Sequence, residues 1–245
     1  MPKVTYITVC LNAADTIRPT IESILRVMDD DVECVVVDGG STDGTCAVLA
    51  DCEPSFKGRL KWISEPDGGI YDAMNKGLRL ATGDWVNYQN DGDVLKAVPR
   101  DELSEAERAG CGLLAAAVET EDGVHEPRVS LVTHFRNTIP HQGAYYRRDV
   151  LNRLGGHDDS YRILGDHDLN VRLLRAGVKV RLSRAVYSFH SIRGLSSHGG
   201  PAIRAEMRRV VRSNDGFGMA CLAFVSNKAF GLGQWIEAHL KRGRR

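Results

Sequence analysis

A chain of 245 residues is long enough for one large α/β domain with its own core, but short for two full domains. Its 32 lysines and arginines balance its 32 aspartates and glutamates, so the overall charge argues against nucleic acid as a main partner. The six cysteines form no Cys-x-x-Cys motif. This pattern indicates reduced thiols in a cytoplasmic protein.

The chain reaches its first apolar run at Val4 without the basic and apolar regions of a signal peptide. No run of eighteen or so apolar residues marks a membrane span, and the closest approach, 219–225, ends at Ser226. We therefore expect a soluble catalytic domain in the cytoplasm. The basic C-terminal stretch, which ends in 241–245, predicts peripheral contact with the anionic inner face of the cytoplasmic membrane, with a solvated tail as the alternative.

Apolar runs rich in β-branched residues alternate with segments of helical periodicity in the first part of the chain. The predicted strands are 4–10, 33–37, 60–63 and 84–88, and the predicted helices are 15–28, 43–51 and 70–80. This succession predicts an α/β fold with a mostly parallel sheet and right-handed crossovers. Ligands of such sheets bind at the carboxyl ends of the strands, so the loops after the strands should carry the chemistry.

The pattern changes after Pro99 to shorter elements of α+β character. We predict a polar helix over 100–109, strands over 112–119, 129–133 and 143–146, a helix over 166–176 and a strand over 178–182. A loop rich in His, Gly and Ser follows over 190–200, and the remainder is basic and helical.

Asp91 and Asp93 follow the predicted strand 84–88 directly. Two carboxylates one residue apart at a strand end can share a divalent cation and its bound diphosphate. The same spacing occurs at 29–31, in a helix-to-strand connection where a solvated acidic turn is the simpler interpretation, and at 166–168. Position therefore favours Asp91 and Asp93.

Asp166 and Asp168 open a predicted helix, where carboxylates are ordinarily favoured by the helix dipole. The preceding stretch with Tyr161 and Gly165 indicates a loop that delivers Asp166 to a site where it could remove a proton from a hydroxyl group. We interpret His167 as a packed or surface histidine rather than a ligand.

Two further polar segments admit structural interpretations. One of residues 41–43 is predicted to cap the following helix, which does not exclude ligand binding by Asp38. Asp72 and Asn75 lie on one helix face and could meet a ligand together, while Lys76 can pair with Asp72. An exposed helix face explains these three residues equally well.

Five segments, in this order, resemble the family 2 glycosyltransferases, especially the bacterial branch that builds surface polysaccharides and glycolipids. They are 8–12, 36–45, 65–77, 81–84 and 90–93, and the resemblance covers roughly residues 3–200. It implies the GT-A fold, in which a Rossmann-like nucleotide-sugar-binding half is fused to an α+β acceptor half of the same domain. We assign 1–98 to the first half, 99–200 to the second, and 201–245 to a basic helical extension.

The resemblance also implies the donor site. Thr8, Val9, Cys10 and Asn12 would line the nucleoside pocket, Asp38 would hydrogen-bond the base, and Asp67 and Asn75 would lie near the base or phosphates. Asp93 would bind the metal directly, while Asp91 would contact the ribose or donor sugar and share the metal. His190 or His198 would complete the metal site, with a loop histidine bonded to the backbone as the alternative.

The implied reaction moves a hexose-type sugar from a nucleoside diphosphate, most often UDP, to a glycan or lipid-linked acceptor. Asp166 would be the general base of a single inverting displacement, assisted by Mn²⁺ or Mg²⁺. The chain has Gly165 where many members have Glu before this Asp. The loop 194–200 is expected to close over the donor as a lid.

Three other classes of protein fit these residues less well. A nucleotide-sugar-binding scaffold or activator of a partner transferase would keep the binding residues, but the intact Asp91, Asp93 and Asp166 argue against it. A nucleotidyltransferase would carry a basic Gly-rich loop after the first strand, and a dinucleotide-dependent dehydrogenase would carry Gly-x-Gly-x-x-Gly there. Residues 11–15 match neither.

Overall fold

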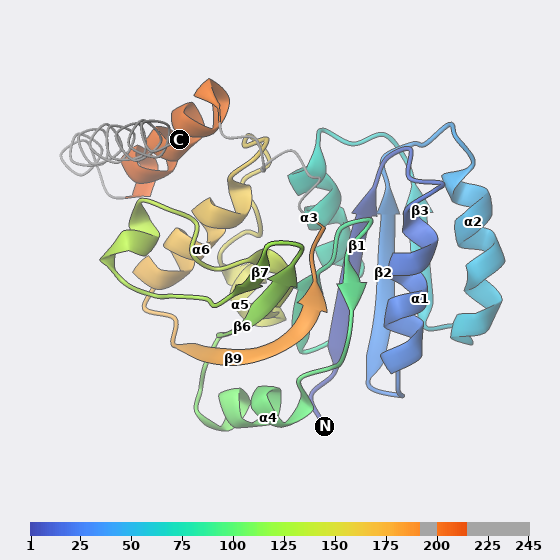
Figure 1. Ribbon diagram of the computed structural model, residues 1–245, viewed down its shortest axis with the longest axis horizontal. Helices are drawn as coiled ribbons and strands as arrows, with labels where there is room; N and C mark the ends of the chain where they lie inside the picture. The colour runs from blue at the N-terminus through green and yellow to red at the C-terminus, as the bar shows by residue number, and fades with distance from the viewer. Residues whose placement is uncertain (192–199, 215–245) are drawn as a thin grey trace, which may run out of the picture.

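A mixed sheet with helices on both faces dominates the computed structural model, which describes residues 1–191 and 200–214 (Figure 1). Its strands are β1 Val4–Cys10, β2 Val32–Asp38, β3 Leu60–Ser64, β4 Trp85–Tyr88, β5 Val94–Leu95, β6 Leu113–Thr120, β7 Gly123–His125, β8 Ala144–Arg147 and β9 Val180–Phe189. Its helices are α1 Ile17–Val27, α2 Thr45–Cys52, α3 Ile70–Leu80, α4 Arg100–Arg108, α5 Arg148–Arg153 and α6 Gly165–Arg175, with 3-10 turns η1 Glu53–Phe56, η2 Leu131–His134 and η3 His141–Gly143. Residues 201–214 are also helical.

The first half of the sheet is parallel, as predicted. β1 pairs with β2 and β4, and β2 pairs with β3, all in parallel, within the strand order β3-β2-β1-β4-β8-β6-β9-β5. Strand order therefore reverses between β1 and β4, which opens a space for ligand at the carboxyl ends of these strands. The predicted bounds of β1 and α3 agree with the structure, and the other predicted elements up to α4 lie within two residues of it.

The second half joins the same sheet by antiparallel pairing of β8 with β4 and with β6. Strands β6 and β8 and helix α6 begin and end within one residue of their predicted bounds. The predicted strand over 178–182 is instead the ten-residue β9, which pairs in parallel with β6 across register shifts between Ala115 and Val118. These irregularities, and the polar residues inside β9, hide its length in the sequence pattern.

The predicted strand over 129–133 is wrong, because this segment forms the 3-10 turn η2. The Ser130 side chain accepts a hydrogen bond from the Val132 N–H, and the Thr133 hydroxyl accepts one from the Ser130 N–H. Ser and Thr side chains that bond their own local backbone compete with strand pairing. Local capping therefore prevailed over the β-branched composition of the segment.

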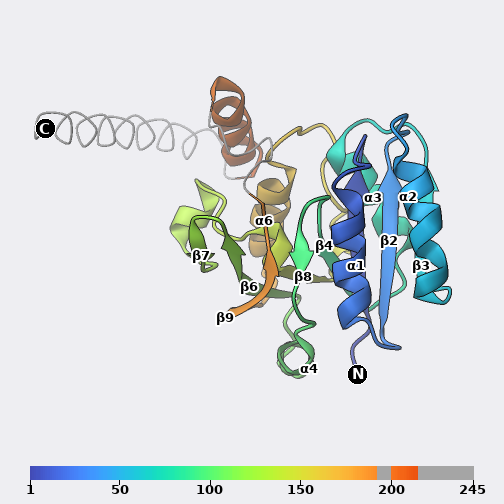
Figure 2. The same ribbon diagram turned by 45° about the vertical axis from the view of Figure 1, so that its right-hand side comes forward.

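Alternation along β1 divides the core into two layers. Ile7 and Val9 pack with the apolar faces of α3, α5 and α6, whereas Tyr6 and Cys10 pack with those of α1, α2 and α4. Successive side chains of a strand point to opposite faces, so both faces of this central strand are buried. Val210, in the helix 201–214, belongs to the first layer, and this helix lies on the side of the molecule that holds α6 (Figure 2).

Within the described residues, no helix combines the length and apolar character that crossing a membrane requires.

The closest approach of α3 to the sheet occurs at Gly77, where a Cβ atom would lie 2.4 Å from Ile7 Cγ2. We expect Gly77→Val to lower the free energy of unfolding by about 1–3 kcal/mol through overpacking. Urea denaturation measures this. Gly68→Ala is the control, since a Cβ there meets only ordinary contacts. Equal unfolding midpoints for both variants would contradict the packing of α3 against β1.

Candidate active site

Hydrogen bonds tie together the loops that follow β1 and β2. Asn12, at a positive φ of 51°, accepts the Thr42 N–H through Oδ1, and its own N–H donates to Ser41 Oγ at 2.7 Å. Among the residues assigned to the nucleoside pocket, Asn12 is exposed. Thr8, Val9 and Cys10 are buried within β1 at 0%, 5% and 6% exposure. Asn12 is therefore the side chain of this group that a nucleotide can reach directly.

Asp38 ends β2 with a fully buried carboxylate. It accepts hydrogen bonds from the Ser41 N–H at 2.9 Å, from the Ser41 hydroxyl and from the Ser64 hydroxyl at 2.6 Å. Burial alone would raise the pKa of Asp38, but these hydrogen bonds outweigh it and hold the pKa below its usual value. The carboxylate thus organises the loop after β2, and its contact with a base stays a prediction.

The helix cap lies one residue beyond the predicted position. Gly44, at φ 100°, is the N-cap of α2, and Asp43 accepts the Thr45 N–H from just outside it. Ser41 is engaged by Asp38 instead. The prediction that one of residues 41–43 is the N-cap was therefore wrong by a residue, because the left-handed turn at this point requires glycine.

The polar residues of α3 mainly form hydrogen bonds and ion pairs with neighbouring residues. The Asn75 amide donates to the His157 carbonyl at 2.8 Å and accepts the His157 N–H at 2.9 Å, which uses both of its polar atoms. Lys76 pairs with Asp72 at 3.7 Å, as predicted. Asp67 accepts the Gly69 N–H at 2.9 Å and remains partly exposed. The two residues expected near the base or phosphates are thus both half-buried, and Asn75 has its polar atoms already engaged.

The loop after β4 carries the paired carboxylates. Asp93 is buried, accepts the Asn90 N–H at 2.8 Å, and lies 2.8 Å from His190 Nδ1 through its other oxygen. Asp91 is exposed and accepts the Thr16 hydroxyl at 2.9 Å. Partial desolvation and then the charge of Asp93 raise the pKa of Asp91. The structure thus brings His190 to Asp93, which lies 97 residues earlier in the chain.

Asp166 lies in the first turn of α6 with its carboxylate almost fully buried. Asn137 Nδ2 donates to it at 2.7 Å and the His167 N–H at 2.8 Å, and the Tyr71 hydroxyl oxygen lies 3.4 Å away. Burial alone would raise the pKa of Asp166, but the interactions with His141 and the His167 N–H lower it overall. A carboxylate held in this way is ionised at neutral pH.

His141 links Asp166 to the loop after β4. Its Nδ1 lies 3.5 Å from Asp166 Oδ2, and its Nε2 accepts from Asn90 Nδ2 at 3.1 Å. Its neighbour Gln142 contacts His190 Nδ1 at 2.8 Å. The candidate base and the paired carboxylates therefore belong to one connected network.

The sequence motifs did not identify His141, Gln142 and Asn137, because the segment before β8 shows no pattern that places it over the end of β4. A weak signal was present: Pro140 is followed by two side chains that can form hydrogen bonds, shortly before a strand. His167 is a packed histidine, as predicted, with its Nε2–H donating to the Thr133 carbonyl at 2.7 Å.

The described ranges, 1–191 and 200–214, contain no group of three or more His, Cys, Asp and Glu side chains arranged to hold a metal ion. His198 and most of the predicted lid, 194–200, lie outside those ranges. Cations that bind with a substrate diphosphate commonly take only one or two carboxylates from the protein and the remaining ligands from phosphate and water. Asp91 and Asp93 offer two carboxylates of that kind, and His190 lies against Asp93.

Comparisons with known proteins identify the family of this chain. Residues 5–96 match the family model "Glycosyl transferase family 2". The chain is 30% identical over 225 residues to an uncharacterized glycosyltransferase of Mycobacterium tuberculosis, covering 85% of this chain and 83% of that protein. It is 32% identical over 212 residues to a PGL/p-HBAD biosynthesis glycosyltransferase of Mycobacterium bovis, covering 80% of each. The chain belongs to the family 2 glycosyltransferases.

Solved structures show that this glycosyltransferase has the GT-A fold, as expected. TarS of S. aureus, in complex with UDP, superposes with a TM-score of 0.67 at 16% identity over 86% of this chain. The match spans 65% of the TarS chain. A mannosyltransferase of Pyrobaculum calidifontis, in complex with GDP-Man and Mn²⁺, superposes with a TM-score of 0.62 at 20% identity, covering 93% of this chain and 75% of that one.

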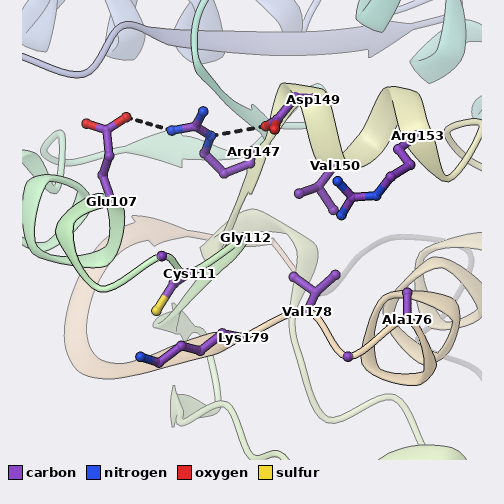
Figure 3. A pocket seen from close by; sticks show the side chains of 12 residues that line it. Glu107, Cys111, Gly112, Arg147, Asp149, Val150, Arg153, Ala176, Val178 and Lys179 are labelled. Carbon is purple, nitrogen blue, oxygen red and sulfur yellow. Dashed lines mark hydrogen bonds and ion pairs between the residues drawn. The ribbon is translucent and has the colours of Figure 1, made fainter.

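The glycosyltransferase also has a pocket of about 430 Å³ at the opposite end of the sheet (Figure 3). Arg147, in the pocket wall, is the sheet neighbour of Trp85, the first residue of β4. Asp91 and Asp93 come after the last residue of β4, at the other end of that strand. Arg147 is bound by Glu107 at 2.6 Å and Asp149 at 3.1 Å. This pocket is therefore remote from the candidate site, and its central guanidinium is already paired.

His157 gives the glycosyltransferase a measurable pH dependence. Its ring stacks on Tyr71 at 5.3 Å and meets the edge of Tyr88 at 5.0 Å, and burial lowers its pKa to about 3. Below pH 6.5 the unfolded chain binds a proton that the folded protein excludes. His157 therefore contributes stability above pH 6.5 that is lost as the pH falls toward 3, at up to ~1.4 kcal/mol per unit.

His157→Phe, which keeps a ring but cannot titrate, should lose this contribution. Between pH 6.5 and 5 we expect the wild type to lose on the order of 2 kcal/mol more unfolding free energy than the variant, measured in urea. The exposed His125→Asn should follow the wild type. Parallel pH profiles for the wild type and His157→Phe would show that His157 is not buried as a neutral ring.

Proposed function

We propose that this glycosyltransferase moves a hexose-type sugar from a UDP donor to a glycan or lipid-linked acceptor of the cell envelope, with inversion. The observation that carries the proposal is the network that joins Asp93, His190 and Asp166 through His141 and its neighbours at the ligand-binding end of the sheet. Residues 1–98 would bind the donor and 99–200 the acceptor. The structures of TarS in complex with UDP and with UDP-GlcNAc support a uridine donor.

Asp93, His190 and Asp91 would hold a divalent cation, Mn²⁺ or Mg²⁺, together with the donor diphosphate. Their imidazole and carboxylate groups suit either ion, and partial burial together with the charge of Asp93 raises the pKa of Asp91. When bound, the cation neutralises the diphosphate and stabilises charge on the leaving oxygen. The complex of the Pyrobaculum calidifontis mannosyltransferase with Mn²⁺ supports this assignment for the fold.

Asp166 would act as the general base. Its carboxylate is ionised and fixed by Asn137 and the His167 N–H, so it can accept the proton of an acceptor hydroxyl as that oxygen attacks the anomeric carbon. A single displacement requires the base on the side opposite the leaving diphosphate and inverts the anomeric centre. Rigid placement of the base supplies part of the rate, because attack requires aligned groups.

We expect Asp166→Asn to bind the donor like the wild type but to lose transfer by about 10²–10⁴-fold. Asp93→Asn should instead lose the Mn²⁺-dependent part of donor binding. Calorimetry with a panel of UDP- and GDP-sugars, with and without Mn²⁺, measures binding, and nucleotide release in the presence of candidate acceptors measures turnover.

The alternative of a silent nucleotide-sugar-binding scaffold makes a different prediction for the same panel. A scaffold would bind the donor but show no turnover that Asp166→Asn removes. If no nucleotide sugar binds, the donor assignment is wrong. If a donor binds but its binding ignores both Mn²⁺ and Asp93, the cation assignment is wrong.

We also propose that the protein is cytoplasmic and contacts the inner face of the membrane through its basic C-terminal part. Arg204, Arg208 and Arg212 are exposed and spaced four residues apart in the helix 201–214, so they form one stripe. Each basic residue near an anionic bilayer adds about 1 kcal/mol of attraction. The stripe suits lipid-linked acceptors, which lie at that surface.

Replacing all three arginines of the stripe by Gln should weaken binding to phosphatidylglycerol vesicles on the order of 100-fold in co-sedimentation. The matched control replaces Arg26, Arg79 and Arg108, which are exposed on α1, α3 and α4, and should leave binding unchanged. Equal losses in both triple variants would indicate a general charge effect, and no loss in either would exclude the stripe.

A further inference from the structure

A single carboxylate holds the backbone that leads into α6. Glu206 accepts the N–H groups of Arg162, Ile163 and Leu164 at 2.9, 3.0 and 2.9 Å. These three residues are followed at once by Gly165 and the candidate base. A helix start has N–H groups without helical partners and favours negative charge, so a carboxylate is well suited to this position.

The same short segment is fixed from its other side by Tyr71. The Tyr71 hydroxyl donates to the Ile163 carbonyl at 2.6 Å, and its ring fills the space next to Gly165, where a Cβ atom would approach it to 2.8 Å. This contact explains why Gly, rather than the Glu of many family members, precedes Asp166. The carboxylate that reaches this loop comes instead from Glu206, about forty residues later in the chain.

The helix that carries Glu206 is firmly anchored. Val210 and Val211 are fully buried, and Asn214 Nδ2 donates to Asp168 Oδ1 at 2.9 Å. The guanidinium of Arg209 lies 4.1 Å above the Tyr161 ring. Figures 1 and 2 show this helix in orange-red on the side of the molecule that holds α6. Glu206 therefore binds the loop from a helix that is itself packed into the core.

We propose that Glu206 is a positioning residue for sugar transfer. By fixing the backbone before Gly165, it sets the place of the Asp166 carboxylate relative to the acceptor hydroxyl, while it lies outside the donor-binding loops. The inference rests on the proposed role of Asp166 as base. A misplacement of about 1 Å in a reacting group can cost on the order of 100-fold in rate.

Glu206→Gln and Glu206→Ala test the proposal. A Gln side chain offers one acceptor oxygen for three N–H groups and turns an NH₂ group toward them, so both variants should release the loop. We expect kcat to fall about 10- to 100-fold while the donor Kd stays within about twofold of the wild type. Glu107→Gln is the matched control, because it breaks the ion pair with Arg147 far from the site and should keep kcat.

Chemical rescue separates positioning from a general loss of structure. Formate should enter the space left in Glu206→Ala, accept the freed N–H groups and restore much of kcat, and it should not restore Asp166→Asn. Hydrogen exchange of the amides of 162–164 should quicken in Glu206→Ala and slow again with formate. An unchanged kcat with quickened exchange, or a loss of kcat that Glu107→Gln shares, would overturn the proposal.

Parallel assays of Asp166→Asn distinguish the two possible failures. If Asp166→Asn is inactive and Glu206→Ala keeps full kcat, the positioning role is wrong and the base assignment stands. If Asp166→Asn turns over like the wild type, the proposed base is wrong, and the positioning role fails with it.

Discussion

The antiparallel pairing of β8 with β4 is the contact on which the active site depends. β4 leads into the loop with Asp93, and the turn just before β8 carries His141 and Gln142. Paired strands fix the positions of their ends, so these two side chains lie over that loop. His141 then contacts Asp166, and Gln142 contacts His190. Two imidazole rings therefore connect Asp166 with the loop that carries Asp93. Without this pairing, the two halves of the sheet would not bring these side chains together in one site.

Three carboxylates at one end of a sheet repel one another and would repel an anionic donor, and the structure compensates each differently. Asp166 is surrounded by hydrogen-bond donors, and Asp93 lies against His190. Asp91 accepts a hydrogen bond from the Thr16 hydroxyl, and partial burial, followed by the charge of Asp93, raises its pKa. Among the described contacts it therefore has the fewest compensating donors of the three carboxylates, and it is the exposed one.

The sequence predicts well the elements whose patterns are local. β1 is a continuous β-branched apolar run and α3 shows a period-3.6 apolar pattern, and their predicted bounds agree with the structure. The segment 129–133 was predicted wrongly, since two hydroxyl side chains decide its conformation against its apolar composition. The ordered motifs marked Asp93 and Asp166 as candidates, and for Asp93 the end of a parallel strand followed from the succession of elements.

The partners of these candidates could not be predicted in the same way. His141 meets Asn90 through sheet pairing between distant segments, and Glu206 meets the backbone before α6 through helix packing. Neither contact leaves a periodic or spaced signal in the sequence, because each partner is a common residue whose role depends only on where the chain returns. The residues that contact or position Asp166 are thus harder to predict from the sequence than Asp166 itself.

The helix 201–214 joins surface and site in one rigid element. Its outer side presents the arginine stripe, while its inner side places Glu206 on the loop before Asp166 and Val210 in the core. Because Val210 is fully buried, this helix cannot separate from the domain without opening the core and withdrawing Glu206. The membrane contact proposed for the stripe and the positioning role proposed for Glu206 therefore depend on the packing of one and the same helix.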